Sequence, residues 1–128
     1  MDKFLVDTNI IIYHLNGDQV ATDWLLCRQE SLAISVITKI EVLSYPFEPE
    51  EEVLVLEFLK QFDLHYVTDE IIEATIQLRK KRKIKTPDAV IAATALVQGL
   101  HVCTRNISDF KNIGVNYINP FEEGDKLK

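Results

Sequence analysis

The sequence predicts a single-domain α/β fold built on a parallel β-sheet. Short apolar runs with strand character alternate along the chain with longer helical runs, which is the pattern of βαβ units. Acidic residues stand where these strand-like runs end or where helices begin, and ligands of open α/β sheets bind at those places. No repeat, low-complexity segment or linker interrupts the 128 residues, so one domain accounts for the chain.

Residues 4–6 are predicted to form the first and central strand, because all three side chains are apolar and both faces of such a strand are covered. Thr8 or Asn9 can cap a short helix that reaches Leu15. Ser35 can cap a later helix, and three glutamates at residues 50–52 suit the positive end of another. The further elements predicted in this half are a helix over 19–28, a strand over 32–35 and helices over 36–44 and 50–62.

In the second half, Thr68 or Asp69 is predicted to cap a helix that ends in a basic turn, with Ile72, Ile76 and Leu78 facing inward. The next helix has clear signals at both ends, because Thr86 can cap it, Pro87 can take its first position and Gly99 can end it. Strands are predicted over 64–67, 101–104 and 115–118, and a charged tail over 122–128.

The composition is that of an ordinary globular protein, with 47% hydrophobic and 27% charged residues. We expect a cytoplasmic protein, because the N-terminus lacks a signal-peptide layout and no apolar run reaches the roughly 18 residues of a membrane span. Cys27 and Cys103 both lie in apolar contexts. Two buried free thiols are favoured over a disulfide between them.

The formal net charge of −6 argues by itself against a nucleic-acid partner, but the charge is unevenly distributed. A basic run precedes Asp88 and can contact RNA phosphates. It can also be a solvated helix end whose cations complement the helix dipole. The candidate RNA contacts in this run are Arg79, Lys81, Arg82, Lys83 and Lys85.

Four acidic residues, Asp7, Glu41, Asp88 and Asp109, are the candidates for chemistry. They are expected to converge on one crevice at the carboxyl ends of the strands. Converging carboxylates repel one another, and a hard divalent cation with oxygen ligands relieves the repulsion. Three of the acids also have a simpler explanation: Asp7 can cap a helix, Glu41 can face solvent and Asp88 can stabilise a helix dipole. The polar loop after residue 104 adds Thr104 and Asn106, which can orient a carboxylate or a water.

Taken together, these segments resemble the PIN domain, and most closely the ribonuclease toxins of type II toxin–antitoxin modules, the VapC-like group. The resemblance runs in order through five segments that span nearly the whole chain. They are Val6-Asp7-Thr8-Asn9, Ser35 with residues 37–43, Pro87-Asp88-Ala89 with residues 90–96, Thr104-Arg105-Asn106-Ile107-Ser108-Asp109-Phe110, and Asn119-Pro120. Many relatives have a glycine soon after the acid at position 41, whereas this chain continues Val42-Leu43-Ser44-Tyr45-Pro46.

The resemblance implies a three-layer α/β/α sandwich with a five-stranded parallel sheet, formed by a PIN domain over residues 1–121. It implies Mg²⁺ or Mn²⁺ held by Asp7, Asp88 and Asp109, with Glu41 orienting water and with Thr8, Asn9, Thr104 and Asn106 supporting the acids. The implied activity is endonucleolytic cleavage of RNA, and the implied partners are a cognate antitoxin and a second copy of the chain.

Three other functions are compatible with an α/β fold of this kind. A signalling receiver module needs adjacent acids after its first strand and a lysine after its last, and Asp7 and Asn119-Pro120 do not provide them. A solitary RNA-processing nuclease would use the same fold and site without a toxin role. A non-catalytic partner-binding module is disfavoured, because a scaffold has no reason to keep mutually repelling carboxylates.

Overall fold

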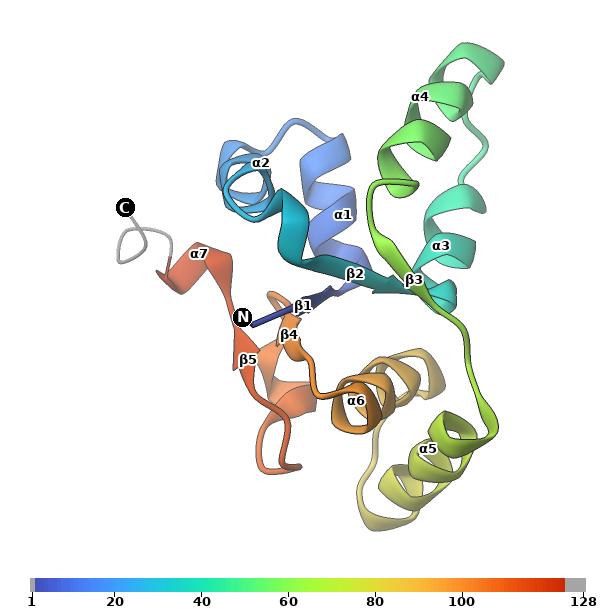
Figure 1. The fold of residues 1–128 in the computed structure, drawn as a ribbon, viewed down its shortest axis with the longest axis vertical. Helices are drawn as coiled ribbons and strands as arrows, with labels where there is room; N and C mark the ends of the chain where they lie inside the picture. The colour runs from blue at the N-terminus through green and yellow to red at the C-terminus, as the bar shows by residue number, and fades with distance from the viewer. Residues whose placement is uncertain (1, 124–128) are drawn as a thin grey trace.

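The computed structural model describes residues 2–123 and contains one five-stranded parallel sheet (Figure 1). The strand order is β3-β2-β1-β4-β5, so β1 is central, and every neighbouring pair is parallel. The predicted α/β class and central first strand are therefore confirmed. The strands are β1 (Phe4–Val6), β2 (Leu32–Ser35), β3 (Asp63–His65), β4 (His101–Cys103) and β5 (Tyr117–Ile118).

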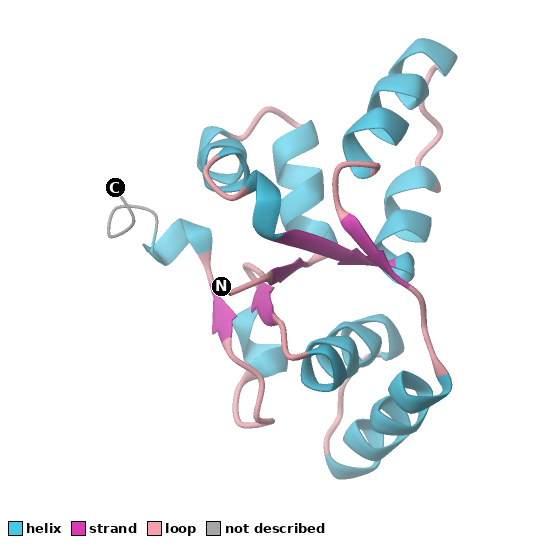
Figure 2. Cartoon of the chain, in the orientation of Figure 1, coloured by secondary structure: helices cyan, strands magenta, loops and turns pink. Residues whose placement is uncertain are grey.

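Helices cover both faces of this sheet, as Figures 1 and 2 show. Four of them, α1 (Thr8–Leu15), α2 (Gln19–Leu26), α3 (Val36–Leu43) and α4 (Pro49–Leu59), lie on one face. On the other face lie α5 (Asp69–Lys81) and α6 (Thr86–Gln98), which pack against each other. The predicted three-layer sandwich is confirmed. Shorter helical segments are η1 (Gln29–Ser31), η2 (Ile107–Phe110) and α7 (Pro120–Glu123).

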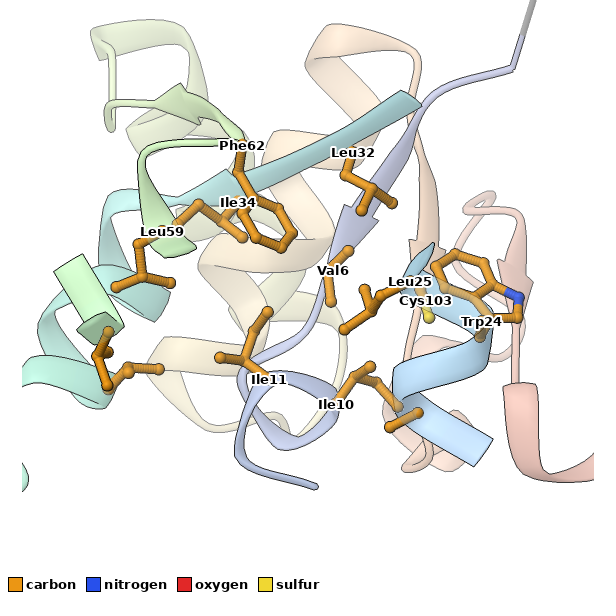
Figure 3. Close-up of a cluster of buried hydrophobic side chains, with 13 residues drawn as sticks. Val6, Ile10, Ile11, Trp24, Leu25, Leu32, Ile34, Leu59, Phe62 and Cys103 are labelled. Atoms are coloured by element: carbon orange, nitrogen blue, oxygen red, sulfur yellow. The ribbon is translucent and has the colours of Figure 1, made fainter. Parts of the chain in front are cut away.

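The central strands bury side chains on both of their faces. In β1, Val6 belongs to the core under α1 and α2, whereas Leu5 belongs to the core under α6. Successive side chains of a strand point to opposite faces, so a strand that is apolar at every position can serve two cores. Figure 3 shows the first core, in which Val6 lies among Ile10, Ile11 and Leu25.

Most helix ends follow the predicted signals, with two corrections. Ser35 caps α3 by accepting the N–H of Ile37 at 3.1 Å, and Gly99 ends α6 in the left-handed conformation at φ 69°. Asp7, rather than Thr8 or Asn9, is the N-cap of α1. Lys85, rather than Thr86, is the N-cap of α6, because the helix already begins at Thr86.

Four further predictions were wrong in detail. Ile72 and Ile76 are 45% and 42% exposed, and Ile71 and Thr75 face inward in their place. The third strand lies at 63–65 and the fifth at 117–118. The two cysteines are free, as expected, but Cys27 is exposed.

The predicted boundary between domain and tail, after residue 121, falls inside α7. Residues 124–128 of the predicted tail lie outside the described residues. No helix among residues 2–123 is long and apolar enough to span a membrane.

Candidate active site

The four predicted acids gather at the carboxyl ends of β1, β2 and β4. Asp7 follows β1, Asp109 lies in η2 after β4, and Glu41 lies on α3, which follows β2. Asp88 is the third residue of α6 and lies at the end of the helix that faces the other acids. Their charges act on one another, since Asp7, Glu41 and Asp109 all raise the pKa of Asp88.

Asp7 is the most buried of the four acids, with 4% of its surface exposed. One carboxylate oxygen, Oδ1, accepts the N–H of Thr8 at 2.8 Å. The other, Oδ2, accepts the hydroxyl of Thr104 at 2.7 Å and the amide of Asn9 at 3.3 Å. Burial raises the pKa of Asp7, and the hydrogen bonds from Thr104 and Thr8 oppose the rise. Asp7 therefore both caps a helix and presents a fixed carboxylate at the mouth of the central strand.

Asp88 has the clearest electrostatic signature in the cluster. Desolvation is the largest cause that raises its pKa, followed by the charges of Asp7, Asp109 and Glu41, and the result is about 6. Hydrogen bonding to Asp109 contributes in the same direction. A carboxyl that is hard to ionise beside other acids is a place where a cation is favoured.

Glu41 is exposed, and its position is fixed by two threonines. Its Oε1 accepts the hydroxyl of Thr8 at 2.6 Å, and the hydroxyls of Thr8 and the buried Thr38 lie 2.9 Å apart. A hydroxyl carries one hydrogen, so when Thr8 donates to Glu41, Thr38 must donate to Thr8. Sequence reasoning missed Thr38, although its place one turn before Glu41 on α3 was a usable signal.

Asp109 is linked to the same network through the loop after β4. Its Oδ2 accepts the side-chain amide of Asn106 at 2.7 Å. The backbone N–H of Asn106 donates in turn to the hydroxyl of Thr104 at 3.0 Å. Since Thr104 also donates to Asp7, one threonine connects the two acids. All four predicted supporting residues, Thr8, Asn9, Thr104 and Asn106, thus contact an acid of the cluster.

The predicted RNA-contact residues fall into two groups. Arg79 donates to the carbonyl of Ile84 at 3.1 Å, and Arg82 donates to the carbonyls of Ser108 and Lys111. Both guanidinium groups are thus used within the protein. Lys81, Lys83 and Lys85 are exposed to solvent.

Arg105, which the sequence did not single out, lies beside the cluster and stacks on two rings. Its guanidinium carbon is 4.1 Å from the ring centre of Phe121 and 5.1 Å from that of Tyr13. Its backbone N–H donates to Asn9 Oδ1 at 3.4 Å. The interactions that hold this arginine are long-range contacts, which local sequence pattern does not reveal.

The chemistry of the cluster suits a hard divalent cation, because every candidate ligand atom is a carboxylate oxygen. Within residues 2–123, no three His, Cys, Asp or Glu side chains form a ready-made cage for an ion. Mg²⁺ commonly keeps several of its waters and uses only one or two protein carboxylates. The four interacting acids have the donor chemistry of such a water-rich site.

A parallel sheet in the order β3-β2-β1-β4-β5, with four acids gathered at the carboxyl ends of its strands, defines the class of protein. The sequence profile of the PIN domain matches residues 4–116, and the chain belongs to the PIN domain family. Among its relatives is ribonuclease VapC10 of Mycobacterium tuberculosis, which is 33% identical over 113 residues. The match covers 83% of this chain and 84% of the relative.

Solved structures support the same assignment. A chain of a toxin–antitoxin complex from Klebsiella pneumoniae superposes with a TM-score of 0.82 and is 34% identical, covering 92% of this chain and 98% of its own. DNA-bound VapBC from Salmonella typhimurium gives a TM-score of 0.81 at 25% identity, covering 94% of this chain and 99% of its own. The expected PIN-like fold is therefore confirmed.

Proposed function

We propose that this chain is a metal-dependent endoribonuclease and the toxin of a type II toxin–antitoxin pair. The observation that carries the proposal is the mutual influence of the four acids, expressed in the pKa of about 6 at Asp88. A ribonuclease among its relatives and a toxin–antitoxin complex among its structural neighbours support this activity and this role.

In this proposal, Asp7, Asp88 and Asp109 hold Mg²⁺ or Mn²⁺ directly or through water. When bound, the ion supplies positive charge that offsets the phosphoryl oxygens and makes water a better nucleophile at neutral pH. Glu41 is exposed and its carboxylate accepts a hydrogen bond from Thr8, which supports the proposed role of Glu41 in orienting the attacking water. Thr104 and Asn9 keep Asp7 in one orientation. No side-chain nucleophile is required.

The RNA backbone is proposed to run beside the acids and to contact three exposed lysines, Lys81 at the end of α5 and Lys83 and Lys85 in the loop before α6. A lysine binds phosphate as a mobile point charge and needs no fixed partner geometry. These lysines would offset the chain's net charge of −6 where the substrate lies.

The cognate antitoxin is proposed to be a protein partner, and the chain is proposed to act in the cytoplasm as a homodimer. Exposed apolar side chains supply surface for such contacts, notably Val53 and Leu54 on α4 and Ile72 and Ile76 on α5. An acidic cluster open to solvent also suits a basic side chain from the antitoxin. The alternatives are a solitary RNA-processing nuclease and a non-catalytic module on the same fold.

The decisive experiment incubates the purified chain with total RNA in EDTA, Mg²⁺ or Mn²⁺ and maps the cut ends. Asp7→Asn and Asp88→Asn should each reduce metal-dependent cleavage by about 100-fold or more, because each removes a charged ligand without changing shape. Asp63→Asn is the matched control, since this acid begins β3 at the opposite end of the sheet. Full activity in both site variants would refute the assignment. If the chain cleaves RNA in vitro but does not slow the growth of cells that express it, the solitary nuclease is favoured.

A further inference from the structure

Arg82 stands between the two segments that carry Asp88 and Asp109. It follows the last residue of α5 in extended backbone conformation, with φ −156° and ψ 159°. Its guanidinium donates from Nη2 to the carbonyl of Ser108 at 3.1 Å and from Nη1 to the carbonyl of Lys111. These two carbonyls lie on either side of Asp109, so one side chain binds the backbone both before and after the acid.

Asp109 lies in η2, a short helical segment between β4 and β5. η2 is a four-residue 3₁₀ helix, and such short helices have few internal hydrogen bonds of good geometry. Phe110 anchors one side of it in the core, and Asn106 holds the Asp109 side chain. The carbonyls of Ser108 and Lys111 are end groups of a helical turn, for which an arginine is a favourable donor.

The same arginine also lies six residues before Asp88 in the chain. The loop between them is fixed by Arg79, which donates to the carbonyl of Ile84 at 3.1 Å, and by Ile84 itself, which is buried. The loop that leads to Asp88 and the turn that carries Asp109 are therefore joined through Arg82. Asp109 is also one of the acids whose proximity raises the pKa of Asp88.

The fork of the guanidinium explains why an arginine occupies this position. Two carbonyl oxygens three residues apart can be bound at once by donors held in a plane, whereas an ammonium group is a single flexible point. Neither carbonyl carries a full charge, so the pairing serves geometry more than charge neutralisation. A guanidinium used in this way has less capacity to bind phosphate than the exposed lysines beside it.

We propose that Arg82 is a positioning residue, which holds the Asp109 turn against the start of α6 so that Asp109 faces Asp88. This role rests on the proposed metal-dependent activity. It differs from the RNA-contact role predicted for Arg82 from sequence. A positioning role predicts damage to metal binding and turnover, while an RNA-contact role predicts damage to RNA affinity.

The test compares Arg82→Ala, Arg82→Lys and Lys80→Ala. Lys80 is an exposed basic residue near Arg82, so Lys80→Ala removes the same charge at a neighbouring position. Three quantities are measured: Mn²⁺ affinity from the EPR signal of the free ion, RNA affinity in EDTA, and kcat at saturating RNA. For Arg82→Ala we expect Mn²⁺ affinity and kcat each to fall by about 10- to 100-fold, as for other residues that orient metal ligands. RNA affinity in EDTA should stay within about 2-fold of the parent.

Arg82→Lys separates the two roles, because it keeps the charge and the stem but loses the fork. The positioning role predicts losses close to those of Arg82→Ala, with Lys80→Ala behaving like the parent chain. If Arg82→Lys restores all three quantities, or if Arg82→Ala weakens only RNA affinity, the proposal is wrong. Should Arg82→Ala fail to fold, Arg82→Lys carries the same comparison.

The Mn²⁺ measurement also separates this proposal from the nuclease assignment. A parent chain that binds Mn²⁺ without cutting RNA contradicts the nuclease activity, yet the loss of Mn²⁺ affinity in Arg82→Lys would still support positioning. A parent chain that binds no Mn²⁺ overturns both.

Discussion

Replacing Thr104 with valine should weaken both the fold and the acidic site, because it removes a buried hydroxyl that binds Asp7. The side chain is fully buried, and its hydroxyl donates to Asp7 Oδ2 at 2.7 Å while accepting the backbone N–H of Asn106 at 3.0 Å. Valine has nearly the same shape and leaves no cavity. The change therefore isolates the hydrogen bonds and leaves Asp7 with only the 3.3 Å contact from Asn9 at that oxygen.

The magnitude follows from the type of bond that is lost. A hydrogen bond to a charged group contributes about 1.5–3 kcal/mol, so we expect the free energy of unfolding to fall by about 2 kcal/mol. In urea this corresponds to a midpoint lower by about 1 M for a domain of this size. The pKa of Asp7 should rise further, because the hydrogen bond from Thr104 is the largest influence that lowers it. Mn²⁺ affinity should drop by about 10-fold or more.

The assay is urea unfolding in EDTA at pH 7, followed by Mn²⁺ titration. Thr94→Val is the matched control, because Thr94 is equally buried but its hydroxyl donates only to the carbonyl of Val90, within α6. That variant should lose about 1 kcal/mol or less and bind Mn²⁺ like the parent chain. If Thr104→Val and Thr94→Val give the same midpoint and the same Mn²⁺ affinity, the hydroxyl does not hold Asp7 in the way described.

Two further predictions concern pH and backbone conformation. The folded-state pKa of Asp88 is about 6 against an ordinary 3.8, so the folded chain binds more protons between these values and its free energy of unfolding in EDTA falls as pH rises. The difference between these two pKa values corresponds to a fall of about 3 kcal/mol at most in the free energy of unfolding. Because the Asp88 carboxyl is only half-buried, solvent screening should reduce this fall to about 1–2 kcal/mol. In urea melts, the free energy of unfolding of Asp88→Asn relative to the parent chain should therefore increase from pH 4.5 to pH 7. If this difference between variant and parent is the same at both pH values, the reasoning is wrong. Gly99→Ala should lower the free energy of unfolding by about 1 kcal/mol, because φ is 69° at this position. RNA cleavage should not change, because no atom lies within 4 Å of an added Cβ. A loss of cleavage activity would contradict a purely local strain.

The acids could be predicted from sequence because their positions follow from simple patterns. An apolar run such as 4–6, followed at once by Asp7, locates an acid at the carboxyl end of a buried strand. Which helix face is buried was harder to predict. Residues 71 and 72 are both isoleucine, so helical spacing fits two registers one residue apart, and packing against α6 selected Ile71.

The support around the acids was less accessible to prediction. Thr38 and Arg82 act through partners 30 and 26–29 residues away in the chain. Residue type shows only that a hydroxyl or a guanidinium is able to bond, and the fold decides which oxygen it meets. The N-cap of α1 could not be predicted for the same reason. Both Asp7 and Thr8 are residue types suited to this position, and the turn geometry selected Asp7.

The link between Asp7 and Thr104 spans 97 residues, and β1 pairs with β4 over a similar separation. During synthesis on the ribosome, a chain that has emerged only as far as α6 lacks β4, the Thr104 hydroxyl and Asp109. Such a fragment cannot assemble the four acids, however well its first helices fold. We therefore expect the proposed nuclease activity only from a chain whose translation is almost complete.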